Sequence, residues 1–368
     1  GFQTGMITAI YRVHGDRGSI AARAQGLATE QSVEMPLSAI DDPFVLDRVV
    51  GKVESITELP DGLFELRIGL AAMTTGHEAG QLMNMLFGNS SIHDDVVLWD
   101  VELPPEVVAA FSGPNLGLEG LRQRVGVWGR ALTCSALKPQ GLPPTQLARL
   151  AHAFARGGLD FIKDDHGLAD QSYSRFADRV RACADAVGDA SVTTGHKTRY
   201  VPSVSGHLDQ LRDQLSLARE AGVDMALIAP MIVGLPAFQA VVQEFPEMGF
   251  MTHPAMAGVA RIAPPLLLGT LFRLLGADAT VFPNHGGRFG YSPDTCRALA
   301  KAALGAWGNV KPCVPVPAGG MTPERVPEML DFYGTDIMLL IGGGLLAARE
   351  RLAEESAAFL EKVRSHGR

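Results

Sequence analysis

The feature that most restricts the fold is a regular alternation of apolar, strand-like runs and amphipathic helices from about residue 130 onward. The strand and helix pairs are expected at 131–137 and 145–155, 159–162 and 173–187, 191–195 and 207–221, 225–229 and 236–245, 249–253 and 264–275, 279–283 and 292–306, 314–318 and 323–333, and 336–341 and 345–364. Eight such units favour a closed parallel (β/α)8 TIM barrel, because closure leaves no unpaired edge strand. A doubly wound open sheet is the alternative, although no Gly-x-Gly-x-x-Gly sequence follows the first strand.

The first 120 residues lack this alternation. Helical patterns occur at 20–30 and 78–86, and strand patterns occur at 6–14 (like an edge strand), at 50–70 (a hairpin around Pro60-Asp61-Gly62) and at 95–103. These elements predict a smaller α+β, ferredoxin-like domain with an antiparallel sheet. We therefore expect an α/β protein of two domains, residues 1–120 and residues 121–368.

Composition excludes several classes of function. A formal charge of −8 argues against a nucleic-acid partner, which requires a basic face. No apolar run reaches the roughly 18 residues of a membrane helix, and the start of the chain has no targeting pattern, so a cytoplasmic protein is expected. The four cysteines lie far apart in the sequence and predict reduced thiols rather than a disulfide framework.

The sequence Gly-Gly-Leu-Asp-Phe-Ile-Lys-Asp-Asp-His at 157–166 places reactive side chains at the end of the second barrel strand. Active sites of such barrels lie at the carboxyl ends of the strands. Lys163, Asp165 and His166 are therefore candidate ligands of a hard divalent metal. The alternative is a plain ion pair between Lys163 and Asp165, with no metal.

Other strand ends carry residues suited to chemistry or anion binding. Lys138 follows the first strand, where burial and nearby cations can lower the pKa of a lysine and allow acid–base catalysis. His253 ends the fifth strand. Paired glycines after the last two strands are suited to phosphate, because backbone N–H groups can approach the anion closely; they are Gly319, Gly320, Gly342 and Gly343.

Taken together, these sequences resemble the RuBisCO superfamily over nearly the whole chain. The family has Gly-Gly-Leu-Asp-Phe-x-Lys-Asp-Asp-Glu at the position of residues 157–166, and a Phe-x-Gly-Pro-x-x-Gly linker that matches residues 111–117. The resemblance implies that Lys138 is a catalytic lysine and that Lys163 can be carbamylated by CO₂ to hold Mg²⁺ with Asp165. Because His166 replaces the glutamate, Mg²⁺ should bind more weakly, or Mn²⁺ should be preferred.

The resemblance also implies contributions from other parts of the chain. Glu30 and Asn89 match loops that cover the metal site of a neighbouring subunit, so a homodimer or a dimer of dimers is expected. Arg288, in a glycine-rich loop, lies near the position of the lysine in the family's mobile lid and could bind a substrate carboxylate. The resemblance implies that one of the family's two phosphate pockets remains in this chain, and that the glycines after the last two strands form it.

Departures from the family pattern exclude a genuine ribulose-bisphosphate carboxylase. Gln140 replaces a second lysine, and Pro254 and Val281 replace the residues of one phosphate site. The chain thus resembles a form IV RuBisCO-like protein that acts on a small monophosphate through a metal-stabilised enediolate.

Three functions follow from this resemblance. The first is a carbon–carbon lyase or hydrolase of carbohydrate metabolism that decarboxylates or cleaves a branched 3-oxo acid monophosphate, 3-oxo-isoapionate 4-phosphate. The alternative is an enolase or isomerase (tautomerase) of a ketose 1-phosphate such as methylthioribulose 1-phosphate, in which an apolar pocket replaces the lost phosphate site. The third is a non-catalytic binding protein that no longer turns over substrate.

Overall fold

The computed structural model describes residues 5–287 and 290–366 and divides the chain into two compact units. Unit 1 comprises Gly1–Ser112, Met256–Leu267 and Trp307–Val310, and unit 2 comprises Gly113–Ala255, Leu268–Ala306 and Lys311–Arg368. No helix among the described residues is long and apolar enough to cross a membrane.

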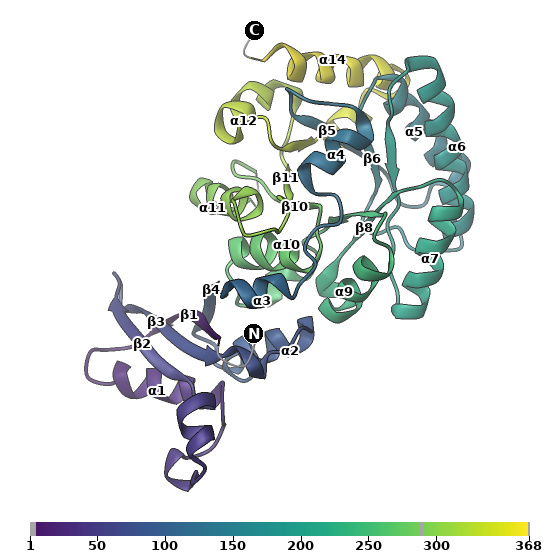
Figure 1. Cartoon of the computed structure of the whole chain (residues 1–368). Helices are drawn as coiled ribbons and strands as arrows, with labels where there is room; N and C mark the ends of the chain where they lie inside the picture. The colour runs from purple at the N-terminus through teal and green to yellow at the C-terminus, as the bar shows by residue number, and fades with distance from the viewer. Residues whose placement is uncertain (1–4, 288–289, 367–368) are drawn as a thin grey trace. The chain divides into compact units, whose positions relative to one another are not determined.

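Unit 1 has the element order of a ferredoxin-like fold. The elements are β1 (Met6–His14), α1 (Ile20–Glu30), β2 (Lys52–Glu58), β3 (Leu63–Ala71), α2 (Ala79–Phe87), β4 (Val96–Glu102) and the short helix α3 (Pro105–Ala109). The strands form an antiparallel sheet in the order β2-β3-β1-β4 (Figure 1). The expected α+β domain with an antiparallel sheet is therefore confirmed.

The expectation that residues 6–14 form an edge strand is wrong. β1 lies between β3 and β4 and pairs with both of them. Its residues Ile7, Ala9, Tyr11 and Val13 are buried on one face, whereas Thr8 and Arg12 on the other face bind carboxylates of β2 and β3. A central strand with one polar face has the same alternation as an edge strand, so the pattern alone does not distinguish them.

Unit 2 is the expected parallel α/β barrel. Its strands are β5 (Leu132–Leu137), β6 (Phe161–Asp164), β7 (Arg199–Val201), β8 (Met225–Ile228), β9 (Gly249–Thr252), β10 (Ala279–Pro283), β11 (Val314–Ala318) and β12 (Met338–Leu340). They form two parallel sheets, β12-β5-β6-β7 and β11-β10-β9-β8. A bridge from Ser203 to Leu227 joins β7 to β8, and β11 lies beside β12, so the strands close into a ring.

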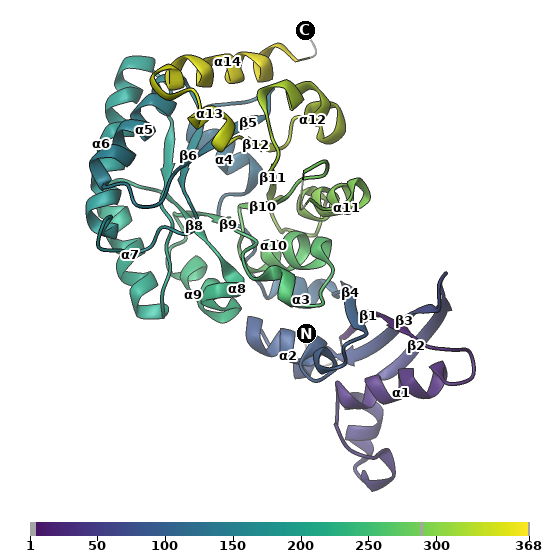
Figure 2. The same ribbon diagram turned by 180° about the vertical axis from the view of Figure 1, so that it is seen from behind.

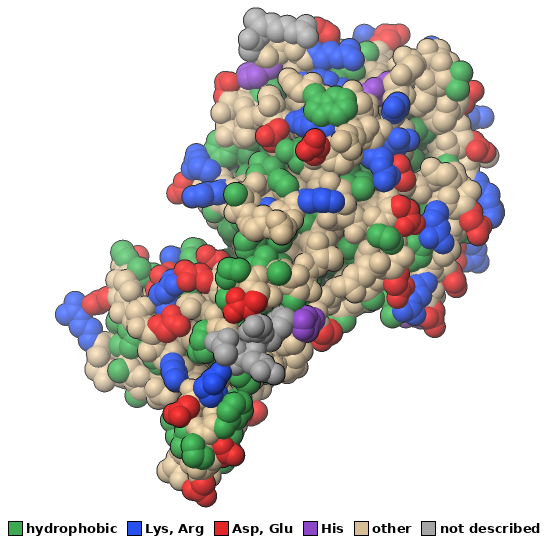
Figure 3. Space-filling view, viewed as in Figure 1, with side chains coloured by type: hydrophobic (Ala, Val, Ile, Leu, Met, Phe, Trp, Pro, Cys, Tyr) green, Lys and Arg blue, Asp and Glu red, His purple; other side chains and the backbone are tan. Residues whose placement is uncertain are grey.

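Helices surround this ring of strands (Figures 1 and 2). They are α5 (Pro144–Arg156), α6 (Phe176–Thr194), α7 (Leu208–Glu220), α8 (Pro230–Val233), α9 (Leu235–Glu244), α10 (Phe272–Leu275), α11 (Pro293–Leu304), α12 (Val326–Tyr333), α13 (Gly343–Leu346) and α14 (Leu352–Ser365). A further helix, α4 (Gly117–Val125), lies within the outline of the ring instead (Figure 1). On the face in Figure 3, acidic and basic side chains are interspersed over the barrel rather than separated by sign.

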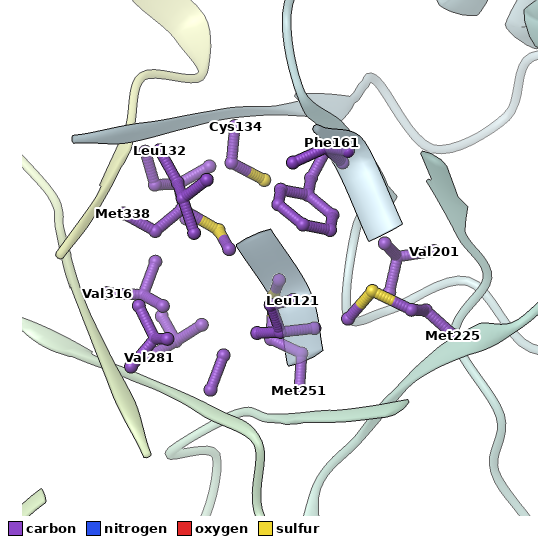
Figure 4. Close-up of a cluster of buried hydrophobic side chains, with 14 of the residues drawn as sticks. Leu121, Leu132, Cys134, Phe161, Val201, Met225, Met251, Val281, Val316 and Met338 are labelled. Carbon is purple, nitrogen blue, oxygen red and sulfur yellow. The ribbon is translucent and has the colours of Figure 1, made fainter. Parts of the chain in front are cut away.

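Apolar side chains fill the inside of the barrel (Figure 4). Each strand contributes at least one buried residue, such as Cys134 from β5, Phe161 from β6 and Met338 from β12. Leu121 and Val125 of α4 belong to the same cluster. The interior is therefore a packed core, as in other barrels of this size, and chemistry is left to the strand ends.

The predicted third barrel strand, residues 191–195, is wrong. These residues continue helix α6, which ends at Gly195 in a left-handed conformation with φ of 72°. The β-branched run Val192-Thr193-Thr194 imitates a strand, whereas the true strand β7 begins at Arg199. His196 therefore precedes its strand, and its Nε2 lies 2.7 Å from Asp160 Oδ1 at the amino end of the barrel, opposite the predicted site.

Candidate active site

The loops after β5 and β6 bring a lysine and a carboxylate together. Lys138 Nζ lies 3.0 Å from Asp165 Oδ1, and the lysine side chain is about half exposed whereas the carboxylate is largely buried. Burial disfavours ionisation of Asp165, but the hydrogen bond and charge of Lys138 outweigh it and lower the pKa of that carboxyl. The alternative reading of a plain ion pair between Lys163 and Asp165 is thus wrong, because the lysine that pairs with Asp165 is Lys138.

Lys163 lies inside strand β6 rather than after it, and it is buried. Its Nζ donates to the backbone carbonyl of Asp164 at 3.1 Å. Burial lowers the pKa of the Lys163 ammonium, and the positive charge of Lys138 adds to this effect. A lysine that loses its proton readily is one that can react as a neutral amine.

Asp164 points away from this site into a buried network that the sequence did not reveal. Its carboxylate accepts hydrogen bonds from Arg179 Nε at 3.0 Å, Tyr200 Oη at 2.8 Å and the Ser203 amide at 2.9 Å. Arg179, fully buried in α6, also donates to the carbonyls of Ser174 and Ala169. The arginine thereby fixes the long loop after β6, which begins with Asp165.

His166 and His253 form a stacked pair. Their ring centroids are 4.0 Å apart and the planes differ by 13°. His253 Nδ1 accepts the amide hydrogen of Ala255 at 3.0 Å, so this nitrogen carries no proton. Burial, followed by the neighbouring His166 and Lys163, lowers the pKa of His253 to about 3. Burial likewise lowers the pKa of His166, which favours the neutral form of this imidazole as well.

A second contact missed by sequence reasoning joins the loops after β5 and β6. Tyr173 Oη donates to Gln140 Oε1 at 2.5 Å, and the other side of the amide packs against Gly167, where a Cβ would come within 2.0 Å of Gln140 Nε2. The residue that replaces the second lysine of the family is therefore held in place. Tyr173 is eight residues beyond Asp165, and no sequence signal linked it to Gln140.

The glycine pairs after β11 and β12 present free backbone donors. Gly319 and Gly320 have φ of 84° and 63°, a left-handed conformation that suits glycine. Within the described part of the chain, no protein acceptor binds the amides of Gly319, Gly320, Gly342 or Gly343. A Cβ placed on Gly342 would lie 4.0 Å from Lys138 Cε, so this glycine is close to the candidate catalytic lysine.

Three further residues were predicted for the site from the resemblance. Arg288 lies outside the described residues. Glu30 and Asn89 both belong to unit 1, where Asn89 Nδ2 donates to the Glu30 carbonyl at 3.4 Å and Glu30 Oε2 lies 2.9 Å from His93 Nε2. The two residues predicted to act together are therefore adjacent in their own unit.

The donor set fits a divalent cation only if Lys163 changes its charge. Among residues 5–287 and 290–366, no three His, Cys, Asp or Glu side chains are placed to hold a metal. Asp165 offers one carboxylate and His166 one imidazole, and an ammonium at Lys163 would repel the ion. A carbamate on Lys163 would supply the missing anionic oxygen, and this set would suit Mn²⁺ as well as Mg²⁺.

A ferredoxin-like unit followed by a barrel with a lysine–aspartate pair at its strand ends is the architecture of the RuBisCO large chain. Residues 117–279 match the family model of the ribulose bisphosphate carboxylase large chain, catalytic domain. The structure of a Rubisco-like protein from Rhodopseudomonas palustris has a TM-score of 0.93 and 52% identity, covering 99% of each chain. The chain belongs to the RuBisCO-like proteins, the form IV branch of this superfamily.

Two further relatives have names that state an activity. A 5-methylthioribulose-1-phosphate isomerase from Rhodospirillum rubrum is 61% identical over 98% of this chain and 96% of its own length. A 2,3-diketo-5-methylthiopentyl-1-phosphate enolase from Exiguobacterium sibiricum is 32% identical over 83% of this chain and 79% of its own. Both names describe chemistry on a phosphorylated methylthio sugar derivative.

Proposed function

We propose that this protein is an isomerase of a 5-methylthio ketose 1-phosphate, with 5-methylthioribulose 1-phosphate as its substrate. The observation that carries the proposal is the 61% identity to the isomerase from Rhodospirillum rubrum along nearly the full length of both chains. The relationship to the enolase supports the same class of chemistry. These relatives favour the alternative drawn from the sequence over decarboxylation or cleavage of a branched 3-oxo acid.

The arrangement of the strand ends supports a substrate that is polar at one end and apolar at the other. The glycine amides after β11 and β12 would bind the phosphate near Lys138. Pro254 and Val281 occupy the positions where the family binds a second phosphate, and neither side chain can bind an anion. Val281 is packed in the barrel core, whereas Pro254 is only partly buried and could contact a methylthio group, whose burial removes apolar area from water.

Isomerisation of a ketose phosphate requires one proton to leave a carbon beside the carbonyl and another to be returned to a different carbon. The intermediate is an enediolate, and no atom is gained or lost overall. Lys138 is the residue that would move a proton, because its amine lies at the mouth of the barrel beside the phosphate glycines. Asp165 would orient that amine through the 3.0 Å contact.

The neutral imidazoles of His166 and His253 would complete the site. A neutral imidazole can donate or accept a hydrogen bond to the enediolate oxygens without bringing a charge. With Lys163 carbamylated, the carbamate, Asp165 and His166 would hold Mg²⁺ or Mn²⁺. A bound ion of this kind supplies charge stabilisation for the enediolate oxygens.

The deciding experiment follows 5-methylthioribulose 1-phosphate and 3-oxo-isoapionate 4-phosphate by proton and phosphorus NMR in D₂O, with Mg²⁺ or Mn²⁺ and bicarbonate. We expect the methylthio sugar to isomerise with deuterium incorporation, and the branched acid to remain unchanged. Loss of a carboxyl group from the branched acid alone would refute the isomerase proposal. Binding of both compounds without any conversion would favour a non-catalytic protein.

We further propose that the active site is shared in a homodimer, with Glu30 and Asn89 of the partner subunit covering the metal ligands. Glu30→Gln and Lys138→Met would each inactivate a homodimer. Mixed after denaturation and refolding, the two variants would form heterodimers with one intact site and regain up to a quarter of wild-type activity, because half of the dimers are mixed and each has one of two sites. A mixture as inactive as its components would contradict a shared site.

A further inference from the structure

Arg325 connects the two loops that flank the proposed phosphate site. It follows β11 closely in sequence, and its guanidinium donates to the Gly320 carbonyl at 3.2 Å and to the His285 carbonyl at 3.1 Å. The first carbonyl belongs to the glycine turn after β11 and the second to the loop after β10. One side chain thus binds the backbone of both loops.

The two loops are also packed closely against each other at glycines. A Cβ on Gly320 would lie 3.2 Å from Gly287 Cα, and a Cβ on Gly286 would lie 3.0 Å from Arg325 Nη2. Both Gly286 and Gly320 have positive φ, at 80° and 63°. The backbone at this point leaves no room for larger residues, and the guanidinium fills the space that a side chain on Gly286 would need.

Binding of the Gly320 carbonyl has a consequence for the anion site. In a planar trans peptide, the C=O of one residue and the N–H of the next point in opposite directions. The arginine therefore sets the direction of the Met321 amide, which follows the free amides of Gly319 and Gly320 and which has no acceptor in the described part of the chain. The orientation of these donors is what an anion-binding turn depends on.

We propose that Arg325 is a positioning residue of the phosphate site, which holds the turn at Gly319–Gly320 against the loop at His285–Gly287 so that the glycine amides converge on the anion. The proposal rests on the proposed function only in its assumption of a phosphorylated substrate. Glu328 pairs with the same guanidinium, with its Oε2 3.3 Å from Arg325 Nε, and its side chain is mostly exposed. Glu328 therefore binds the guanidinium from the solvent side, and an exposed ion pair of this kind should contribute less to its position than the two backbone carbonyls.

The test measures the dissociation constant of inorganic phosphate by phosphorus NMR titration, without turnover. Arg325→Gln should weaken binding by about tenfold, because the anion would then have to order the glycine turn that the guanidinium otherwise holds in place. Arg325→Lys keeps the charge and the aliphatic stem but cannot bind both carbonyls, so it should weaken binding to a similar extent. Glu328→Gln should change the constant less than about twofold.

A matched control is Arg351→Gln, which removes another arginine that pairs with a glutamate three residues later, Glu354. It should leave phosphate binding unchanged. Wild-type affinity in Arg325→Lys would overturn the proposal, because charge rather than positioning would then explain any effect of glutamine. Failure of the wild-type protein to bind phosphate would also overturn it, whereas the isomerase assay would still decide the proposed function by itself.

Discussion

Replacement of Arg179 by methionine provides a demanding test of the structure around the site. Methionine has a similar length and keeps apolar packing, but it leaves the Asp164 carboxylate buried without its ionic partner. Both side chains are fully buried, and Arg179 Nε lies 3.0 Å from Asp164 Oδ2. The substitution also removes the donors to the carbonyls of Ser174 and Ala169.

The expected loss of stability is large. Removal of one partner of a buried ion pair typically costs about 3–5 kcal/mol. Asp164 would retain hydrogen bonds from Tyr200 Oη at 2.8 Å and the Ser203 amide at 2.9 Å, which places the expected loss near the lower end of that range. Against a total unfolding free energy of about 5–15 kcal/mol, such a loss is easily measured.

Urea unfolding monitored by circular dichroism would measure it. The double variant Arg179→Met/Asp164→Asn removes both charges but keeps an oxygen acceptor for Tyr200 Oη and the Ser203 amide, so it should recover part of the stability that the single variant loses. Arg212→Met, which breaks an exposed pair with Glu244, serves as the control and should leave the urea midpoint unchanged. A loss below about 1 kcal/mol in Arg179→Met would refute the buried network, as would a double variant less stable than the single one.

Three further predictions concern the site itself. Lys138→Met should lower kcat by about 10²–10⁴ without lowering the melting temperature, because the lysine is half exposed; full activity would exclude a role in proton transfer. Because the pKa of His253 is about 3 in the folded protein and about 6.5 in the unfolded chain, the unfolded chain binds more protons between these values. The free energy of unfolding should therefore fall as the pH decreases from about 6.5 toward 3. In His253→Gln, urea unfolding in metal-free buffer should show a smaller fall over the same range. The same pH dependence in this variant and in the wild-type protein would contradict the lowered pKa of His253. Mn²⁺ should raise the melting temperature only with bicarbonate present, and Lys163→Met should abolish this effect; stabilisation by Mn²⁺ in carefully CO₂-free buffer would argue against a carbamate.

Most of the fold was predictable because its signals are local. Helix α1 and strand β1 begin and end where the hydrophobic periodicity predicts, and the turn before Gly62 follows from its sequence. The failures have non-local causes. Whether β1 lies at the centre or edge of its sheet depends on strands far away in sequence, and residues 191–195 remain helical because α6 continues through them despite their β-branched composition.

The site was predictable only as a set of residue types at strand ends. The positions of Lys138, Asp165 and His253 follow from barrel topology, but their partners do not. Sequence spacing could not show that Lys138 rather than Lys163 binds Asp165, or that Asp164 turns away toward Arg179. In a strand, neighbouring side chains point to opposite faces, so a one-residue uncertainty in the end of β6 decides which groups face the site.

Two residues of the site that differ from the family pattern each make a specific contact with another side chain of the site. Gln140, which replaces a lysine, is bound by Tyr173, and His166, which replaces a glutamate, stacks on His253. In a protein that had lost its activity, substituted residues would have no reason to be held by specific neighbours. Both contacts lie at the carboxyl ends of the strands, next to the pair of Lys138 and Asp165. This pattern favours a site adapted to a different substrate over a non-catalytic protein, and it makes Tyr173→Phe and His166→Glu informative changes of specificity rather than of stability.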